Sequence, residues 1–235
     1  MDGLCAVLWP LAFWSGILAV GACALFIGGV RGPLLLVGAL PAAVLAETVL
    51  ELIQTRLSVP FTWLTVSLTA VTLGLLAALL RRIPAGRPVG AGASVREDRW
   101  PSTWAVALAM VGSTATAYVV VWLAGGGDWE VASQTWDTFF DANAIRAAAQ
   151  SQILAPNRIT DFASPGPLEN YYPSSFHGLG VLLVQMTGCD AVVATNVVAG
   201  LIAGAIWPAT AALASHYVLG RRALLPALVL AWGFH

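Results

Sequence analysis

The stretch that decides the fold is "PFTWLTVSLTAVTLGLLAALL", residues 60–80, which contains no charged side chain. A helix needs about 20 apolar residues to cross the hydrocarbon core of a bilayer. The stretch is long enough, and Arg81 and Arg82 follow it directly. Pro60 suits the first turn of a helix, where a backbone N–H donor is not needed. Residues 60–80 are therefore predicted to span a membrane.

The composition of the whole chain supports the same class of protein. Of the 235 residues, 58% are apolar and only 10% are charged, with a mean hydropathy of +0.80, whereas soluble domains carry about 25% charged residues. The predicted fold class is all-α, a polytopic bundle of transmembrane helices with a long outer loop that contains an amphipathic interfacial helix. Membrane lipids are the expected partners. The net charge of −1 gives no reason to expect nucleic acid binding.

Four further apolar runs are long enough to span, at residues 4–30, 33–53, 102–124 and 190–218. Residues 81–100 hold five arginines against two acids and read as a loop. We divide the chain into residues 1–100, the first helices with this loop, and residues 101–235. A further apolar run begins at residue 223, which predicts that the chain is the N-terminal part of a longer protein.

The positions of the arginines predict the orientation, because basic residues favour cytoplasmic loops. With the loop at 81–100 inside, the polar segment 125–172 lies outside and the first residue lies outside too. We predict that residues 174–187 cross the bilayer, which leaves Arg221 and Arg222 outside, against the rule. A re-entrant 174–187 is the alternative, and it would place both arginines inside. The predicted location is a bacterial plasma membrane.

The outer segment contains "SQTWDTFFDANAIRAAAQS", residues 133–151, which has the pattern of an amphipathic helix with Ser133 as its cap. Asp137 and Asp141 lie four residues apart, so their carboxylates project from one face and repel each other. A solvated helix face is one interpretation. The other is a general base or a pair of ligands for a divalent cation at the membrane surface.

A second polar stretch is "ENYYPSSFHGLG", residues 169–180. Tyr171 and Tyr172 suit the aromatic belt of a membrane interface. Pro173 is predicted to start a helix, which places His177 about one turn inside it. His177 is either a buried side chain bonded to a backbone carbonyl or a polar group that faces a cavity at membrane depth.

A second pair of acids with the same spacing, Glu47 and Glu51, lies near the end of the run at 33–53. Arg56 is close enough in sequence to pair with Glu51. We favour an interpretation in which both side chains reach out to the interface, with a functional site as the alternative.

The two polar stretches together resemble a known family. The pattern W-D-x-x-x-x-x-N-A, here residues 136–144, followed by Y-P-x-x-x-H, here residues 172–177, resembles large actinobacterial polytopic membrane proteins of uncharacterised function. That layout is similar to the GT-C class of membrane glycosyltransferases, which take a sugar from a polyprenyl-phosphate donor and use an essential Asp in the first large outer loop.

The resemblance implies roles for particular residues. Asp137 takes the place of the loop acid and would be the catalytic base, while Asp141, Arg146, Tyr172 and His177 would bind the substrate. A divalent cation, if one is used, would be held by Asp137 and Asp141. This chain departs from the family in having Asp141 where the family has His. It also departs from a simple GT-C layout, because three spans precede the one before the motif.

The sequence leaves two other kinds of function open. The chain could be a transporter, in which the outer acids gate a cation, or a non-catalytic membrane scaffold. The relation between Asp137 and His177 separates them. A shared outward-facing cavity favours the enzyme, burial of both at mid-bilayer favours transport, and exposure on separate surfaces favours a scaffold.

Overall fold

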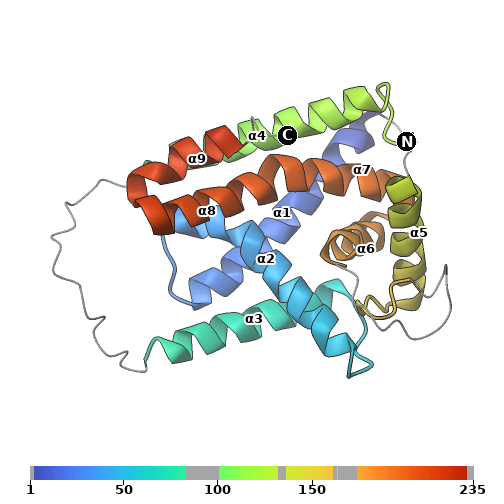
Figure 1. Ribbon diagram of the computed structural model, residues 1–235, viewed down its shortest axis with the longest axis horizontal. Helices are drawn as coiled ribbons and strands as arrows, with labels where there is room; N and C mark the ends of the chain where they lie inside the picture. Colours follow the sequence, from blue (N-terminus) through green and yellow to red (C-terminus); the bar gives the residue numbers. More distant parts are fainter. Residues whose placement is uncertain (1–2, 83–100, 132–135, 161–162, 164–173, 232–235) are drawn as a thin grey trace, which may run out of the picture.

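The fold is known from a computed structural model, which describes residues 3–82, 101–131, 136–160, 163 and 174–231. Within these ranges the regular structure is entirely helical (Figure 1). The elements in chain order are α1 (Gly3–Ile27), α2 (Pro33–Gln54), α3 (Trp63–Leu80), α4 (Thr103–Ala124), α5 (Trp136–Ser151), α6 (Ser175–Thr187), α7 (Ala191–Leu201), the π-helix η1 (Ile202–Ile206), α8 (Trp207–Leu219), the 3₁₀ turn η2 (Arg221–Ala223) and α9 (Leu224–Leu230).

Five helices in the described ranges are long and apolar enough to cross a membrane: α1, α2, α3, α4 and the continuous rod of α7, η1 and α8. The predicted polytopic all-α membrane fold is therefore confirmed. Pro33 begins α2 as expected. Pro60 does not begin α3; that helix is capped by Thr62, whose hydroxyl accepts from the backbone N–H of Thr65. The Thr65 hydroxyl in turn accepts from the Thr62 N–H, which is a reciprocal cap.

The first three spans pack with their backbones close together. A β-carbon at Gly21 would collide with the carbonyl of Ala39 in α2, and one at Gly74 would lie 2.5 Å from the carbonyl oxygen of Ala24 in α1. Membrane helices are held by van der Waals contact rather than by the exclusion of water, so small residues mark their closest approaches. These glycines explain how α1 fits between α2 and α3.

The rod of α7 and α8 is interrupted by η1 at a proline. Pro208 has no N–H to donate to the carbonyl of Gly204, four residues earlier, and an unpaired carbonyl is costly in a bilayer. Ser113 of α4 supplies the missing donor, with its hydroxyl 2.6 Å from the Gly204 oxygen. The interruption therefore fixes α4 against the middle of the rod.

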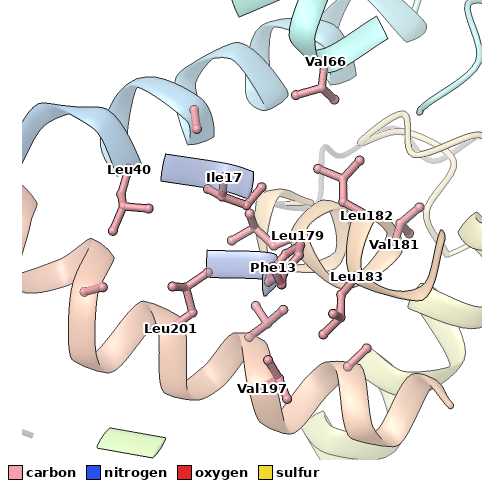
Figure 2. Close-up of a cluster of buried hydrophobic side chains, with 14 of the residues drawn as sticks. Phe13, Ile17, Leu40, Val66, Leu179, Val181, Leu182, Leu183, Val197 and Leu201 are labelled. Atoms are coloured by element: carbon pink, nitrogen blue, oxygen red, sulfur yellow. The ribbon is translucent and has the colours of Figure 1, made fainter. Parts of the chain in front are cut away.

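The helix α6 is shorter than the five helices that could span, which favours the re-entrant alternative for residues 174–187 over the predicted crossing. It has 13 residues, which at about 1.5 Å per residue span about 20 Å, short of the hydrocarbon thickness of about 30 Å. In Figure 1, α6 is seen nearly end-on while α7 and α4 run across the view. Its apolar side joins the main core, where Figure 2 shows leucines of α6 beside side chains of α1 and α7: Leu179, Leu182, Leu183, Phe13, Ile17, Val197 and Leu201.

The ends of α7 and α8 decide where the last arginines lie. The chain enters α7 at the same end as α5 and leaves α8 at the opposite end (Figure 1). Five arginines in the described ranges then lie at that opposite end: Arg31, Arg81, Arg82, Arg221 and Arg222. The end that carries α5 and α6 has Arg56, Arg146 and Arg158 in the described ranges. The arginine distribution is thus asymmetric, as the rule for basic residues requires.

Candidate functional site

Polar side chains of α2 and of α5 contact the start of α6, and we call this group the polar junction: Glu47 and Glu51 of α2, Asp141 of α5, and Ser174 and His177 at the start of α6. The helix α5 lies across the ends of the spans, along the right-hand side of Figure 1. Its inner face is buried through Ala144, Ile145 and Ala148. A β-carbon at Gly180 of α6 would collide with Ile145, so this glycine lets α5 approach α6 closely.

The segment after α5 is fixed to the end of α2, which holds α5 in place. The Gln54 amide donates to the Gln152 carbonyl at 3.1 Å and accepts from the Leu154 N–H at 2.9 Å. The Phe61 N–H also donates to the Gln152 carbonyl, at 2.9 Å. These bonds use backbone groups that the end of α5 would otherwise leave unpaired.

Asp141 and His177 form a hydrogen-bonded pair between α5 and α6. The distance from Asp141 Oδ1 to His177 Nε2 is 2.8 Å, and the imidazole is 2% exposed against 21% for the carboxylate. The rings of Phe140 and Phe176 stand edge-on to the imidazole, with centroids 5.9 and 5.6 Å away. One interpretation of the sequence had His177 bonded to a backbone carbonyl. The structure instead pairs His177 Nε2 with a carboxylate. Such a partner fixes the orientation of the ring.

Asp137 lies one turn before Asp141 but is exposed. The two predicted neighbours therefore differ in environment, since one carboxylate is directed into the junction and the other faces outward. The predicted roles of Tyr172 and Pro173 fall outside the described residues, as does the cap at Ser133. The predicted helix at 133–151 is present as α5, from residue 136.

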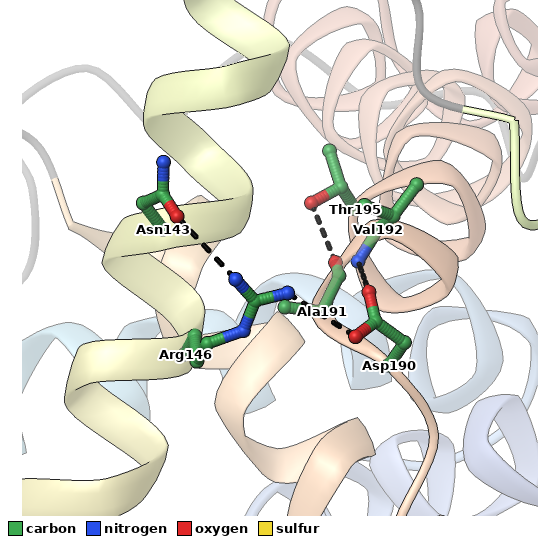
Figure 3. Close-up of polar contacts among 6 residues, drawn as sticks. All are labelled: Asn143, Arg146, Asp190, Ala191, Val192 and Thr195. Atoms are coloured by element: carbon green, nitrogen blue, oxygen red, sulfur yellow. Dashed lines mark hydrogen bonds and ion pairs between the residues drawn. The ribbon is translucent and has the colours of Figure 1, made fainter.

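Arg146, on the outer side of α5, contacts the start of α7 (Figure 3). Its guanidinium donates to Asp190 at 3.2 Å, and the two side chains are 49% and 55% exposed. Asp190 also caps α7 by accepting from the Val192 N–H at 2.8 Å. Burial raises the pKa of the neighbouring Cys189 thiol, which keeps that group neutral. Asp190 thus joins the outer side of α5 to the N-terminus of α7.

The favoured interpretation of Glu47 and Glu51, in which both side chains reach out to the interface, is wrong. Each is only 1% exposed, so neither side chain reaches out to the interface. Glu51 accepts from the Ser174 hydroxyl at 2.7 Å, and the described contacts include no pairing with Arg56. The sequence contained one sign of this burial. No charged residue lies in the helical turn before Glu47, so the acid pair lies inside an apolar run.

Glu47 is in direct contact with the backbone of α6. A β-carbon at Gly178 would collide with Glu47 Oε1 and lie 2.8 Å from its Cδ. The hydroxyls of Thr48 and Ser175 are 2.9 Å apart and join the same two helices. Glycine at 178 and hydroxyls at 174 and 175 therefore fit the start of α6 to the acidic face of α2.

A metal ion has few ligands here. Within the described ranges no group of three or more His, Cys, Asp or Glu side chains could hold one. Asp137 and Asp141 as a divalent-cation pair stay a prediction, and they would need water or substrate oxygens to complete the coordination.

The comparisons with known proteins place the chain in a family without adding a function. No curated protein and no solved structure matches the chain. One family model, described as "Family of unknown function (DUF6541)", matches residues 17–235. The match takes in α2, α5 and α6, and with them every residue of the polar junction. The chain is a member of the DUF6541 family.

Proposed function

We propose that this membrane protein transfers a sugar from a polyprenyl-phosphate donor to an acceptor of the bacterial cell envelope, as in the GT-C class of glycosyltransferases. The observation that carries the proposal is the position of Asp137. It is exposed on a helix that lies across the ends of the spans, one turn from the buried Asp141–His177 pair. The resemblance of residues 136–144 and 172–177 to actinobacterial membrane proteins supports the same reading.

The proposed reaction occurs at the outer membrane interface. The end rich in arginine faces the cytoplasm, because basic residues are retained there, so the segment 125–172 is extracytoplasmic. A polyprenyl-phosphate sugar keeps its lipid in the bilayer and its phosphate at the level of α5. Arg146 is the arginine on the outer side of this helix, and a guanidinium binds phosphate oxygens in a bidentate manner.

In the proposed step Asp137 acts as the general base. Its carboxylate accepts the proton of an acceptor hydroxyl, the hydroxyl oxygen forms a bond to the anomeric carbon, and the bond to the polyprenyl phosphate breaks. The leaving phosphate takes the bonding electrons. Asp141 and His177 hold α5 on α6 and so position Asp137, and a divalent cation on the phosphate would be held by Asp137 with Asp141.

The test is transfer of radiolabelled sugar from polyprenyl-phosphate donors to lipid acceptors in membranes that contain the full-length gene product. We expect Asp137→Asn to lower transfer by about 10² to 10⁴, the usual contribution of a general base. Glu130→Gln removes one negative charge from the same polar segment and should leave transfer unchanged. Surviving transfer in Asp137→Asn would remove this residue from the mechanism. No transfer with any donor would reject the proposed activity, and an effect of chelators would reveal a cation.

One observation favours a second function, proton-coupled transport. Glu47 and Glu51 are buried in a membrane span, and ionisable residues within spans commonly mark ion pathways. Flux of solutes driven by a pH gradient in proteoliposomes, lost in Glu47→Gln but kept in Asp137→Asn, would favour the transporter over the transferase.

A further inference from the structure

The two carboxyl groups of α2 form an enclosed site that the proposed sugar transfer does not use. Glu47 and Glu51 are each 1% exposed, and Gly178 of α6 covers the Glu47 carboxyl group. Both oxygens of Glu47 and the Oε1 atom of Glu51 have no hydrogen-bond partner among the described residues. A buried carboxyl group without a donor is costly, so these three oxygens require an explanation.

The helices around the site offer no positive charge. The elements packed against α2 are α1, α3, α4, α6, α8 and η1, and none of them contains Lys or Arg. Their titratable side chains are Cys5 and Cys23 of α1, Tyr118 of α4, His177 of α6, and His216 and Tyr217 of α8. His177 is paired with Asp141, and His216 lies in the last turn of α8, at the opposite end of the bundle. Two negative charges here would therefore have no cationic partner on these helices.

A proton fits the site better than a metal ion does. Mg²⁺ and Ca²⁺ take about six oxygen ligands or more in proteins, whereas no group of three or more His, Cys, Asp or Glu side chains among the described residues could hold a metal ion. The Ser174 hydroxyl donates to Glu51 at 2.7 Å, and a donor stabilises the ionised form of its acceptor. A proton on Glu47 supplies an O–H donor at the Glu47 end of the site, where both carboxyl oxygens lack a described partner.

We propose that Glu47 and Glu51 form a proton-binding site between α2 and α6, with the proton on Glu47 and the negative charge on Glu51. Ser174 and Gly178 lie within one turn on either side of His177, so the site shares its helix with the Asp141–His177 pair. Loss of the proton would place two charges against the start of α6 and change the position of His177. The proposal does not depend on the transferase activity.

The test is infrared spectroscopy of the full chain in lipid nanodiscs at neutral pH. A protonated carboxyl group has a C=O stretching band that a carboxylate lacks and that shifts in D₂O. We expect one such band from a buried acid in the wild type, absent in Glu47→Gln and present in Glu51→Gln. Asp137→Asn is the matched control and should leave the band in place. The absence of the band, or its survival in Glu47→Gln, would overturn the proposal.

A second measurement keeps the test independent of whether Glu47→Gln folds. Wild-type protein made with ¹³C-carboxyl glutamate should show the band shifted to lower frequency, whereas ¹³C-carboxyl aspartate should leave it unshifted. A band that follows the aspartate label would overturn the proposal. Addition of Na⁺ or Mg²⁺ at constant pH should have no effect, and a band that either ion removes would assign the site to a metal ion instead.

Discussion

Two pairs of acids in this protein have the same spacing and opposite surroundings. Glu47 and Glu51 lie four residues apart on α2, and each is 1% exposed. Asp137 and Asp141 lie four residues apart on α5, where the first is exposed and the second is 21% exposed and bonded to His177. The spacing puts each pair on one helix face. The neighbours of the helix decide what that face contacts.

The difference arises from the positions of the two helices. Other spans surround α2, and the start of α6 closes the face that carries its acids. Only one side of α5 is packed, because the helix lies across the ends of the spans with its other side exposed. The inner pair, Glu47 and Glu51, can therefore bind only a ligand that fits between two helices, such as the proposed proton. The outer pair, Asp137 and Asp141, presents one carboxylate to the junction and one to the outside of the protein.

The largest effect is expected for Gly178→Ala, which tests how closely the inner pair is packed. The new methyl group would overlap Glu47 Oε1 and lie 2.8 Å from Leu154 Cδ2, and the enclosed carboxyl group has little room to move. We expect the free energy of unfolding to fall by about 3 kcal/mol, as for overpacked cores. Unfolding of the purified protein in detergent measures this.

Gly112→Ala is the matched control for that substitution. Gly112 also lies inside a spanning helix, but a β-carbon there meets nothing within 4 Å. Alanine should raise stability slightly, because glycine is the poorer helix former by about 1 kcal/mol. An equal change in the free energy of unfolding of the two variants would show that the contact between Gly178 and Glu47 does not limit stability.

The next effect is expected at the outer pair. Asp141→Ala removes the partner of His177 Nε2, a nitrogen on a side chain that is 2% exposed, and should cost about 2 kcal/mol because a buried polar group loses its hydrogen bond. Asp137→Ala should cost only a few tenths of a kcal/mol, as for exposed positions. Thermal unfolding of both variants checks the difference. A larger loss for Asp137→Ala would mean that the outer acid has a structural role.

The sequence was sufficient to predict the spans and insufficient to predict the junction. A run of about 20 apolar residues predicts a spanning helix without reference to its neighbours, and all five runs of that length form helices long and apolar enough to span. The Asp141–His177 contact joins residues 36 positions apart, and it depends on how α5 docks on α6. The burial of Glu47 depends likewise on Gly178, which the sequence does not distinguish from the many other glycines of the chain.

The path of residues 174–187 was hard to predict for a similar reason. The apolar run was short, and only the 13-residue helix with its cap at Gly188, where φ is +67°, shows that it ends before it could span. The arginines had already pointed to the alternative, since a helix that does not cross places Arg221 and Arg222 with the other basic residues. The charge rule was the better guide here than hydropathy.

A smaller effect is expected for Ser174→Ala, which removes the hydroxyl that donates to Glu51 at 2.7 Å. A single hydrogen bond contributes about 1 kcal/mol to stability, and the loss should appear in unfolding measurements in detergent. Ser15→Ala is the control, because the Ser15 hydroxyl bonds only to the Leu11 carbonyl of its own helix among the described contacts. If the two variants behave alike, the contact between Ser174 and Glu51 does not stabilise the inner pair.

The smallest effect is expected for Arg146→Gln, at the outer edge of the junction. The Arg146–Asp190 pair is about half exposed on both sides, at 49% and 55%, and exposed ion pairs contribute about 0.5 kcal/mol. Its loss should shrink further in high salt, because mobile ions screen exposed charges, whereas the cost of Asp141→Ala should persist. Unfolding measured at low and high salt separates the two. If Arg146→Gln were as costly as Asp141→Ala at both salt concentrations, the outer face of α5 would be closed in the protein, and Asp137 would lose the access to solvent on which its proposed role depends.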